Sequence, residues 1–170
     1  DIYVKETWNT LLPIEQYTES LADKNKYETG IRGQTTFPYL LPVLSEVKKN
    51  KYDYAILEKT PFGNTYTTDF ATNLIVNEKL GKDDHTDVLM ICYTANENIG
   101  SLFGPNSVEL EDALLRLDKD IAHLISFLEE SIGKENLLVF LTSDHGVAQV
   151  PTYLADHRIP VGYFNQNGAI

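Results

Sequence analysis

Two adjacent residues late in the chain carry the side chains best suited to binding a metal. Asp144 and His145 follow the apolar run at 137–143, and Gly146 comes directly after them. A carboxylate oxygen and an imidazole nitrogen are donors that zinc and similar divalent metals accept. Gly146 permits a sharp turn that would bring both side chains to the same or neighbouring ions. An Asp–His pair is also typical of a polar turn, so the elements around it decide between the two interpretations.

Those elements predict a strand–helix–strand unit. Two segments are continuous apolar runs of strand length: 87–94, "DVLMICYT", and 137–143, "LLVFLTS". Such runs are typical of strands covered on both faces. Between them, leucine and isoleucine recur every three or four residues and predict a helix over 107–130. Two parallel strands joined by such a helix connect by a right-handed crossover.

This topology predicts where a site would form. The carboxyl ends of parallel strands lie at one edge of a sheet, and sites in open α/β sheets form outside that edge. The first strand leads into "TANENIGS", which contains Glu97, and the second leads into Asp144 and His145. We therefore expect these three side chains to converge on one crevice.

The rest of the chain predicts further α/β elements and an irregular start. A strand is expected over 52–60, a turn at 61–65, a helix ending at Gly81 and a loop over 95–107. Residues 1–50 contain no convincing strand of a parallel sheet. The fold class is accordingly α/β, with a parallel sheet, flanking helices and an irregular N-terminal segment. The 170 residues fit one domain.

Composition excludes some classes of function. The formal net charge is -11, without a cluster of lysine or arginine, so a nucleic-acid backbone is not an expected partner. No segment reaches the roughly 18 apolar residues of a membrane span. The single cysteine, Cys92, lies in an apolar run and is expected to be a buried core residue. It permits no intrachain disulfide, which leaves the compartment open.

Three stretches taken together resemble a known superfamily: "EKTPFGNTYTTDFA", the region from "FGPNS" through the long helix, and "LVFLTSDHGVAQVP". In this order they are similar to the alkaline phosphatase superfamily, in the bacterial branch related to type I phosphodiesterases and nucleotide pyrophosphatases. The similarity is clearest over residues 52–162. It implies that 1–170 is a fragment of an alkaline-phosphatase-like domain, with 1–50 as an irregular cap-like part and 51–170 as part of the α/β core.

The resemblance also implies a chemistry. Members of the superfamily hydrolyse phosphate mono- or diesters with two zinc ions and a threonine or serine nucleophile. By resemblance, Asp144 and His145 match an Asp–His pair of metal ligands. In the other loop, Glu97 stands where the family pattern has a ligand aspartate, and Ser101 stands where it has a ligand histidine. Glu97 is therefore a third, weaker candidate ligand.

Three hypotheses for the function remain open. The first is a metal-dependent phosphate-ester hydrolase, which would bind one or two zinc ions when complete and act on a small-molecule phosphate ester. The second is a degenerate relative that lost the second metal site and acts in binding or scaffolding, and the third is a purely structural or interaction fragment without a metal. No residue of this chain matches the nucleophile, so we expect the chain alone to be inactive. With two firm ligands where zinc needs about four, weak or no zinc binding is expected from it.

The resemblance further implies a periplasmic or secreted protein. The sequence begins "DIYVKETW" without an initiator methionine. Any targeting segment is therefore expected to lie outside this chain.

Overall fold

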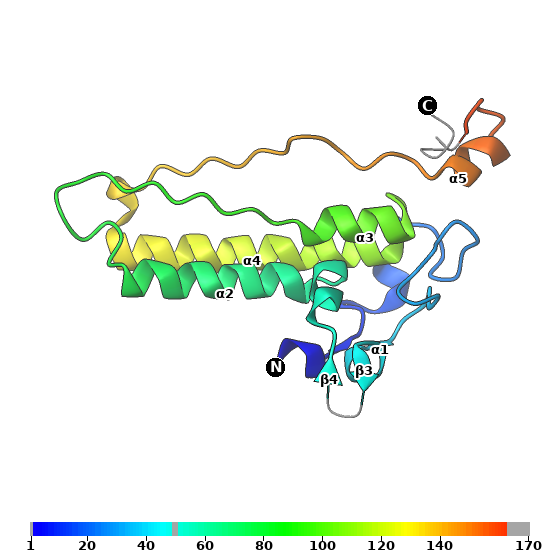
Figure 1. Cartoon of the computed structure of the whole chain (residues 1–170). Helices are drawn as coiled ribbons and strands as arrows, with labels where there is room; N and C mark the ends of the chain where they lie inside the picture. The colour runs from blue at the N-terminus through cyan, green and yellow to red at the C-terminus, as the bar shows by residue number, and fades with distance from the viewer. Residues whose placement is uncertain (1, 49–50, 163–170) are drawn as a thin grey trace, which may run out of the picture.

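Three helices form the body of the molecule. The computed structural model describes residues 2–48 and 51–162 (Figure 1). Helix α2 spans Phe62–Asn77, α3 spans Ala95–Phe103 and α4 spans Val108–Ile132. Helix α4 packs against both α2 and α3.

The other elements are short and lie mostly before α2. Strands β1 and β2 pair antiparallel, with Trp8 opposite Tyr39, and β3 pairs antiparallel with β4. The remaining bounds are η1 Tyr3–Lys5, β1 Thr7–Trp8, η2 Ile14–Gln16, β2 Tyr39–Leu40, α1 Leu41–Leu44, β3 Glu46–Lys48, β4 Lys51–Tyr52, η3 Tyr54–Lys59, η4 Lys134–Asn136 and α5 Pro151–Asp156.

Helix α4 confirms the prediction for 107–130 closely. The hydroxyl of Ser107 accepts a hydrogen bond from the backbone N–H of Leu110 at 3.2 Å, which caps the start of the helix. Gly133 follows the last turn with φ 95°, a conformation that ends helices and favours glycine. Leu110 and Leu124 of the predicted apolar stripe are buried, whereas Leu114 is exposed.

One hydrophobic core joins the N-terminal segment to the helices. Trp8, Tyr39 and Phe103 are its largest members, with ring centroids of Trp8 and Tyr39 at 5.1 Å and of Trp8 and Phe103 at 6.3 Å. Ile99 of α3 and Leu110 of α4 complete the same cluster. This core contains residues from both sides of residue 50. The division into a cap-like part over 1–50 and a part of the α/β core over 51–170 stays a prediction.

Three local predictions were wrong. Within 52–60, Tyr52 ends the short strand β4 and Tyr54–Lys59 form the 3₁₀ helix η3 rather than one continuous strand, because the carboxylate of Asp53 accepts from the N–H of Ala55 at 3.1 Å and starts a helical turn. Residues 61–65 belong to the first turn of α2 rather than to a separate turn. The expected loop over 95–107 contains α3, whose buried Ala95, Ile99 and Phe103 recur every fourth residue.

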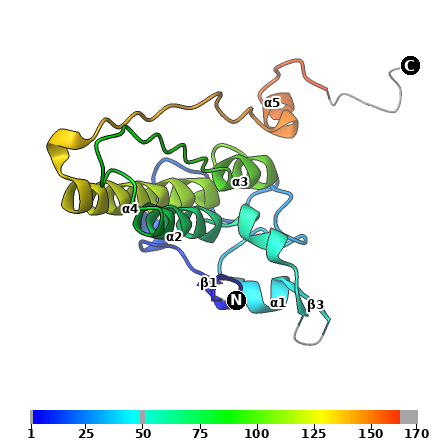
Figure 2. The ribbon, with the colours of Figure 1, turned by 60° about the vertical axis from the view of Figure 1, so that its left-hand side comes forward.

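The two predicted parallel strands are extended segments here. Figures 1 and 2 show that 87–94 and 137–143 run in the same direction, toward α3 and α5. Within residues 2–48 and 51–162, no β-ladder joins either segment to another strand. Val88 and Phe140 are 89% and 83% exposed, which corrects the expectation of strands covered on both faces. Cys92, expected in the core, is exposed for the same reason. An extended segment needs neighbours to complete its backbone hydrogen bonds, and the part of the chain that the structure describes places no strand beside these two.

Candidate functional site

Glu97 lies in the first turn of α3, directly after the extended segment 87–94. Two contacts with α2 hold this junction in place. The side-chain amide of Asn64 donates to the side-chain oxygen Oδ1 of Asn96 at 3.0 Å, and the hydroxyls of Thr68 and Tyr93 lie 3.0 Å apart. The position of Glu97 is therefore set by α2 as well as by its own helix.

Asp144 and His145 lie on an exposed turn after 137–143. Their side chains are 87% and 61% exposed, with Oδ2 of Asp144 3.6 Å from Nε2 of His145. Nδ1 of His145 lies 3.0 Å from the carbonyl oxygen of Gly146. The pKa of His145 is raised, most strongly by that hydrogen bond and less by the charges of the Asp144 and Glu97 carboxylates. The convergence of these three side chains on one crevice stays a prediction.

Two glycines allow the segment after His145 to lie close to α3. A Cβ atom on Gly100 would lie 2.7 Å from Cγ2 of Val147, and one on Gly104 would lie 2.8 Å from Cγ2 of Val150. Real Cβ atoms do not approach so closely, so these positions require glycine or a shift of the segment. The close approach at Gly100 brings the Asp144–His145 turn toward the helix that carries Glu97.

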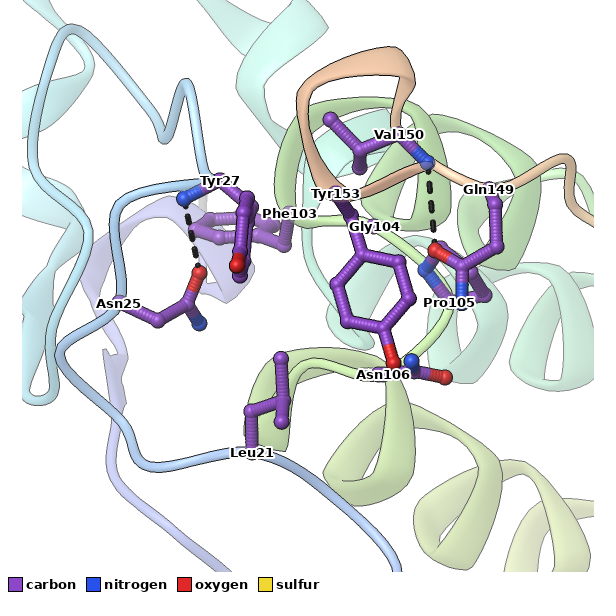
Figure 3. Close-up of a pocket in the computed structure, with 10 residues that line it drawn as sticks. All are labelled: Leu21, Asn25, Tyr27, Phe103, Gly104, Pro105, Asn106, Gln149, Val150 and Tyr153. Atoms are coloured by element: carbon purple, nitrogen blue, oxygen red, sulfur yellow. Dashed lines mark hydrogen bonds between the residues drawn. The ribbon is translucent and has the colours of Figure 1, made fainter. Parts of the chain in front are cut away.

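Aromatic contacts anchor the following residues (Figure 3). The rings of Tyr27 and Tyr153 meet edge-on with centroids 5.2 Å apart, and the Tyr27 hydroxyl donates to Asp156 at 3.1 Å. Nζ of Lys26 lies 2.5 Å from Asp156, which lowers the pKa of that carboxyl through the hydrogen bond. The small cavity between these residues and Phe103 holds about 10 Å³. That is room for at most about one water molecule, so this is a packing gap rather than a ligand site.

The donor set of the predicted metal site is incomplete in the described residues. Asp144 and His145 are the donor types that zinc accepts, but a zinc site uses three or four protein ligands. In residues 2–48 and 51–162, no three histidine, cysteine, aspartate or glutamate side chains are grouped so that they could hold a metal. Ser101 is exposed and offers only a neutral hydroxyl. The metal-binding roles of Asp144, His145 and Glu97 stay predictions.

A larger pocket, of about 520 Å³, lies at the N-terminal end of α3. Its walls come from segments far apart in the chain, so no local sequence pattern predicts it. The hydroxyl of Tyr3 donates to Asp69, and the ring of Tyr3 meets that of Tyr66 edge-on with centroids 5.6 Å apart. The lining residues are Tyr3, Tyr54, Leu57, Glu58, Gly63, Tyr66, Thr67, Thr94 and Ala95. Its volume is in the range of pockets that bind small molecules, roughly 300–1,000 Å³.

A buried acidic network was also missed. The carboxylate of Asp112 accepts hydrogen bonds from the Trp8 indole at 2.6 Å, from the Tyr17 hydroxyl at 2.5 Å and from Nε of Arg116 at 2.7 Å. Burial, followed by the bond to Asp112, raises the pKa of Tyr17 to about 12. Asp112 and Glu109 of α4 are both 0% exposed. The sequence signal for their burial is that both acids lie on the same side of α4 as Leu110 and Ala113.

Comparison with known proteins places this arrangement in a family. Residues 6–168 match the family described as type I phosphodiesterase / nucleotide pyrophosphatase. The chain is 44% identical over 160 residues to alkaline phosphatase PhoV of Synechococcus elongatus, which covers 94% of this chain and 28% of PhoV. It is 43% identical over 164 residues to alkaline phosphatase PafA of Elizabethkingia meningoseptica, with 95% and 29% covered. The crystal structure of wild-type PafA matches with a TM-score of 0.85 and 42% identity, over 95% of this chain and 31% of that chain.

The fold is that of the alkaline phosphatases, in a partial form with little sheet. The chain belongs to the type I phosphodiesterase / nucleotide pyrophosphatase family of the alkaline phosphatase superfamily. This confirms both the resemblance and the fold class expected from the sequence. The chain spans about 30% of the length of the relatives it matches. No helix among the described residues has the length and apolar character needed to cross a bilayer.

Proposed function

We propose that this chain forms part of a metal-dependent hydrolase of phosphate mono- or diesters. The observation that carries the proposal is the 44% identity to an alkaline phosphatase over 94% of the chain. The location of Asp144, His145 and Glu97 at the ends of two segments that run the same way supports it. Because no residue of this chain matches the family's nucleophile, turnover requires parts of the relatives' length that this chain does not cover.

Asp144 and His145 are the proposed ligands of a zinc ion, with Glu97 as a weaker third. Because Nδ1 of His145 donates to the Gly146 carbonyl, the lone pair of Nε2 is left for a metal. A zinc ion, when bound, would stabilise the charge that develops on the phosphoryl oxygens during displacement. The turn at Gly146 and the contact of Val147 with Gly100 orient the two ligands.

The pocket at the N-terminal end of α3 is the proposed binding site for the organic group of the ester. Its tyrosine rings and Leu57 suit an aromatic or apolar group, and the Glu58 carboxylate disfavours a second anionic group. The hydrogen bond of Tyr3 to Asp69 fixes one wall. Burial raises the pKa of Tyr3 to about 12, so its hydroxyl stays protonated.

The assay of the full-length protein with zinc and two substrates, an aryl phosphate and a bis-aryl phosphate, tests the proposal. Asp144→Ala is expected to lower kcat/KM by about 100-fold or more, since it removes a metal ligand. The matched control is Asp83→Ala, at an exposed loop residue whose carboxylate accepts from the backbone N–H of His85 at 2.8 Å. An absence of turnover with both substrates would contradict the hydrolase.

The pocket has its own measurement. Tyr66→Ala is expected to raise KM for the aryl phosphate by about tenfold with little change in kcat, since it removes binding that ground and transition states share. Methyl phosphate should be hydrolysed as before. Phe70→Ala, which removes an exposed ring from the same helix outside the pocket, is the control and should leave both substrates unaffected.

A degenerate relative is the second candidate, and Glu97 and Ser101 are the residues that favour it. Both stand where the family pattern has metal ligands, and a serine hydroxyl is a poor ligand for zinc. The zinc content of the purified full-length protein separates the candidates. Two ions per chain would exclude degeneracy, whereas one ion without turnover, or none, would favour a binding or scaffolding role.

We further propose a periplasmic or secreted location. The support is membership of a superfamily with alkaline phosphatases among the relatives. Fractionation of cells that produce the full-length protein tests this location, and recovery only with the cytoplasmic fraction would refute it.

A further inference from the structure

Half-buried Glu28 and fully buried Glu109 each have one buried carboxyl oxygen without the hydrogen-bond partner that a buried charge needs. Glu109, in the first turn of α4, is 0% exposed. Its Oε1 accepts from the Tyr39 hydroxyl at 2.5 Å, while its Oε2 is buried without a hydrogen-bond partner. Oε2 of Glu28 is also buried and lacks a partner, although the other oxygen accepts from Asn25. A buried charge in this state is costly and is commonly relieved by a proton.

The neighbours of the pair are acidic. The negative charge of Asp23 contributes to raising the pKa of both carboxyls. The charge of Asp112, one turn along α4, contributes to raising the pKa of Glu109. The other charged group bound to Asp112 is Arg116, whose Nε lies 2.7 Å away. Burial is the first cause that raises the pKa of Glu28, to about 8, and that of Glu109, to about 7. The charge of Glu109 is the second cause for Glu28.

Glu28 lies in a segment that holds several elements together. We name residues 21–30 the clamp segment. The N–H groups of Leu21 and Thr29 donate to the carbonyls of Asn106 and Leu102, at 2.7 and 2.8 Å, which binds the segment to α3 and to the turn after it. On its other side, Lys26 and Tyr27 contact Asp156 and Tyr153 of α5, as described above. The clamp segment therefore connects α3 with the arm that follows Asp144 and His145.

We propose that Glu28 and Glu109 form a proton-dependent latch, which holds the clamp segment against α4 when the pair carries a proton and loosens it when that proton is lost in alkaline solution. Loss of the proton leaves the buried charge of Glu109 and the half-buried charge of Glu28 beside Asp23, and movement of Glu28 into solvent relieves this repulsion. Because Glu28 is in the clamp segment, that movement also weakens the contacts to Leu102 and to α5. The latch does not depend on the proposed hydrolase activity.

Hydrogen exchange of the full-length protein at pH 6.5 and pH 9, corrected for the intrinsic exchange rate, tests the latch. Hydrogen exchange in residues 21–30 and 151–158 is expected to be about tenfold faster at pH 9. A tenfold change in the population of the loosened state corresponds to one unit of pKa. Exchange in α2 should not change. Glu28→Gln, which is neutral at both values, should abolish the difference, while Glu130→Gln, at an exposed position of α4, should retain it.

Three results would overturn the proposal. The first is equal protection of the clamp segment at both pH values. The second is an unchanged pH dependence in Glu28→Gln. The third is full restoration of protection at pH 9 by added Ca²⁺, which would mean that the pair binds a cation rather than a proton. Glu109→Gln provides a further check, and if it does not fold, the Glu28→Gln result decides.

Discussion

The aromatic core and the two extended segments are both rich in apolar residues, but only the core is packed. Trp8, Tyr39 and Phe103 are almost fully buried, whereas Val88 and Phe140 are almost fully exposed. The difference lies in the backbone. Helices α3 and α4 satisfy their hydrogen bonds internally and present a side-chain face to the core, whereas segments 87–94 and 137–143 need lateral neighbours. Apolar composition therefore predicts burial only where the backbone bonds can also be completed.

Truncation of one aromatic residue in each region gives the sharpest contrast. Trp8→Ala is expected to lower the free energy of unfolding by about 3–5 kcal/mol, because it leaves a cavity and removes the donor to Asp112. Phe140→Ala should lower it by less than about 0.5 kcal/mol. Urea unfolding followed by circular dichroism measures both. A similar loss in the two variants would break the comparison, since it would mean that the segment 137–143 is packed in solution.

The pH dependence of the free energy of unfolding should come from Glu28 and Glu109 rather than from the extended segments. Glu28 and Glu109 have pKa values of about 8 and about 7 in the folded chain, above the ordinary value of 4.5. Between these values the folded chain binds more protons than the unfolded chain, so stability falls as pH rises from about 4.5 to about 8. The urea midpoint should be lower at pH 9 than at pH 5. In Glu28→Gln the decline should be smaller, and an identical decline would assign it to other groups.

The junction between the regions is expected to respond less. Gly100→Ala places a Cβ 2.7 Å from Val147, and overpacking of about 1–3 kcal/mol is partly offset by the higher helix propensity of alanine. A net loss of about 1 kcal/mol should result, with faster hydrogen exchange at 147–150. Gly146→Ala is the control, since nothing lies within 4 Å of its Cβ position. Equal exchange in the two variants would mean that the Gly100 contact does not hold the arm.

The smallest effect is expected on the exposed face of an extended segment. Leu138→Thr should change the free energy of unfolding by less than about 0.5 kcal/mol, because Leu138 is 80% exposed. It should nonetheless reduce light scattering, since exposed apolar strands associate edge to edge. Leu110→Thr in the core is the contrast and should be strongly destabilising. Unchanged scattering in Leu138→Thr would indicate that this face is already covered.

Local patterns were sufficient to predict α4 and most of α2. Ser107, Gly133 and the leucine repeat are signals that lie within the helix and its ends, so α4 was placed within a few residues. In α3, asparagine and glycine masked the spacing of Ala95, Ile99 and Phe103, and a loop was predicted instead. The 3₁₀ helix η3 was mistaken for a strand because the four-residue apolar run at 54–57 is too short to distinguish the two.

In the candidate site, too, some features could be predicted from local sequence patterns and others could not. Asp144 and His145 were found because a strand-length apolar run, an Asp–His pair and a glycine are adjacent in sequence. The tyrosine pocket and the Glu28–Glu109 pair were not, because each depends on contacts between distant segments. Tyr39 and Glu109, for example, are separated by 70 residues in the chain. No local pattern reports that a glutamate of an amphipathic helix will meet a buried tyrosine.

The hydrogen bond between Trp8 and Asp112 joins residues that are 104 positions apart. At ribosomal rates of about 5–20 residues per second, Trp8 leaves the ribosome roughly 5–20 seconds before its acceptor. The aromatic core therefore has a high contact order, and its closure must follow formation of α4. During synthesis Trp8 therefore cannot reach its acceptor, or the leucine and alanine of α4 that share its core, until that helix has been made.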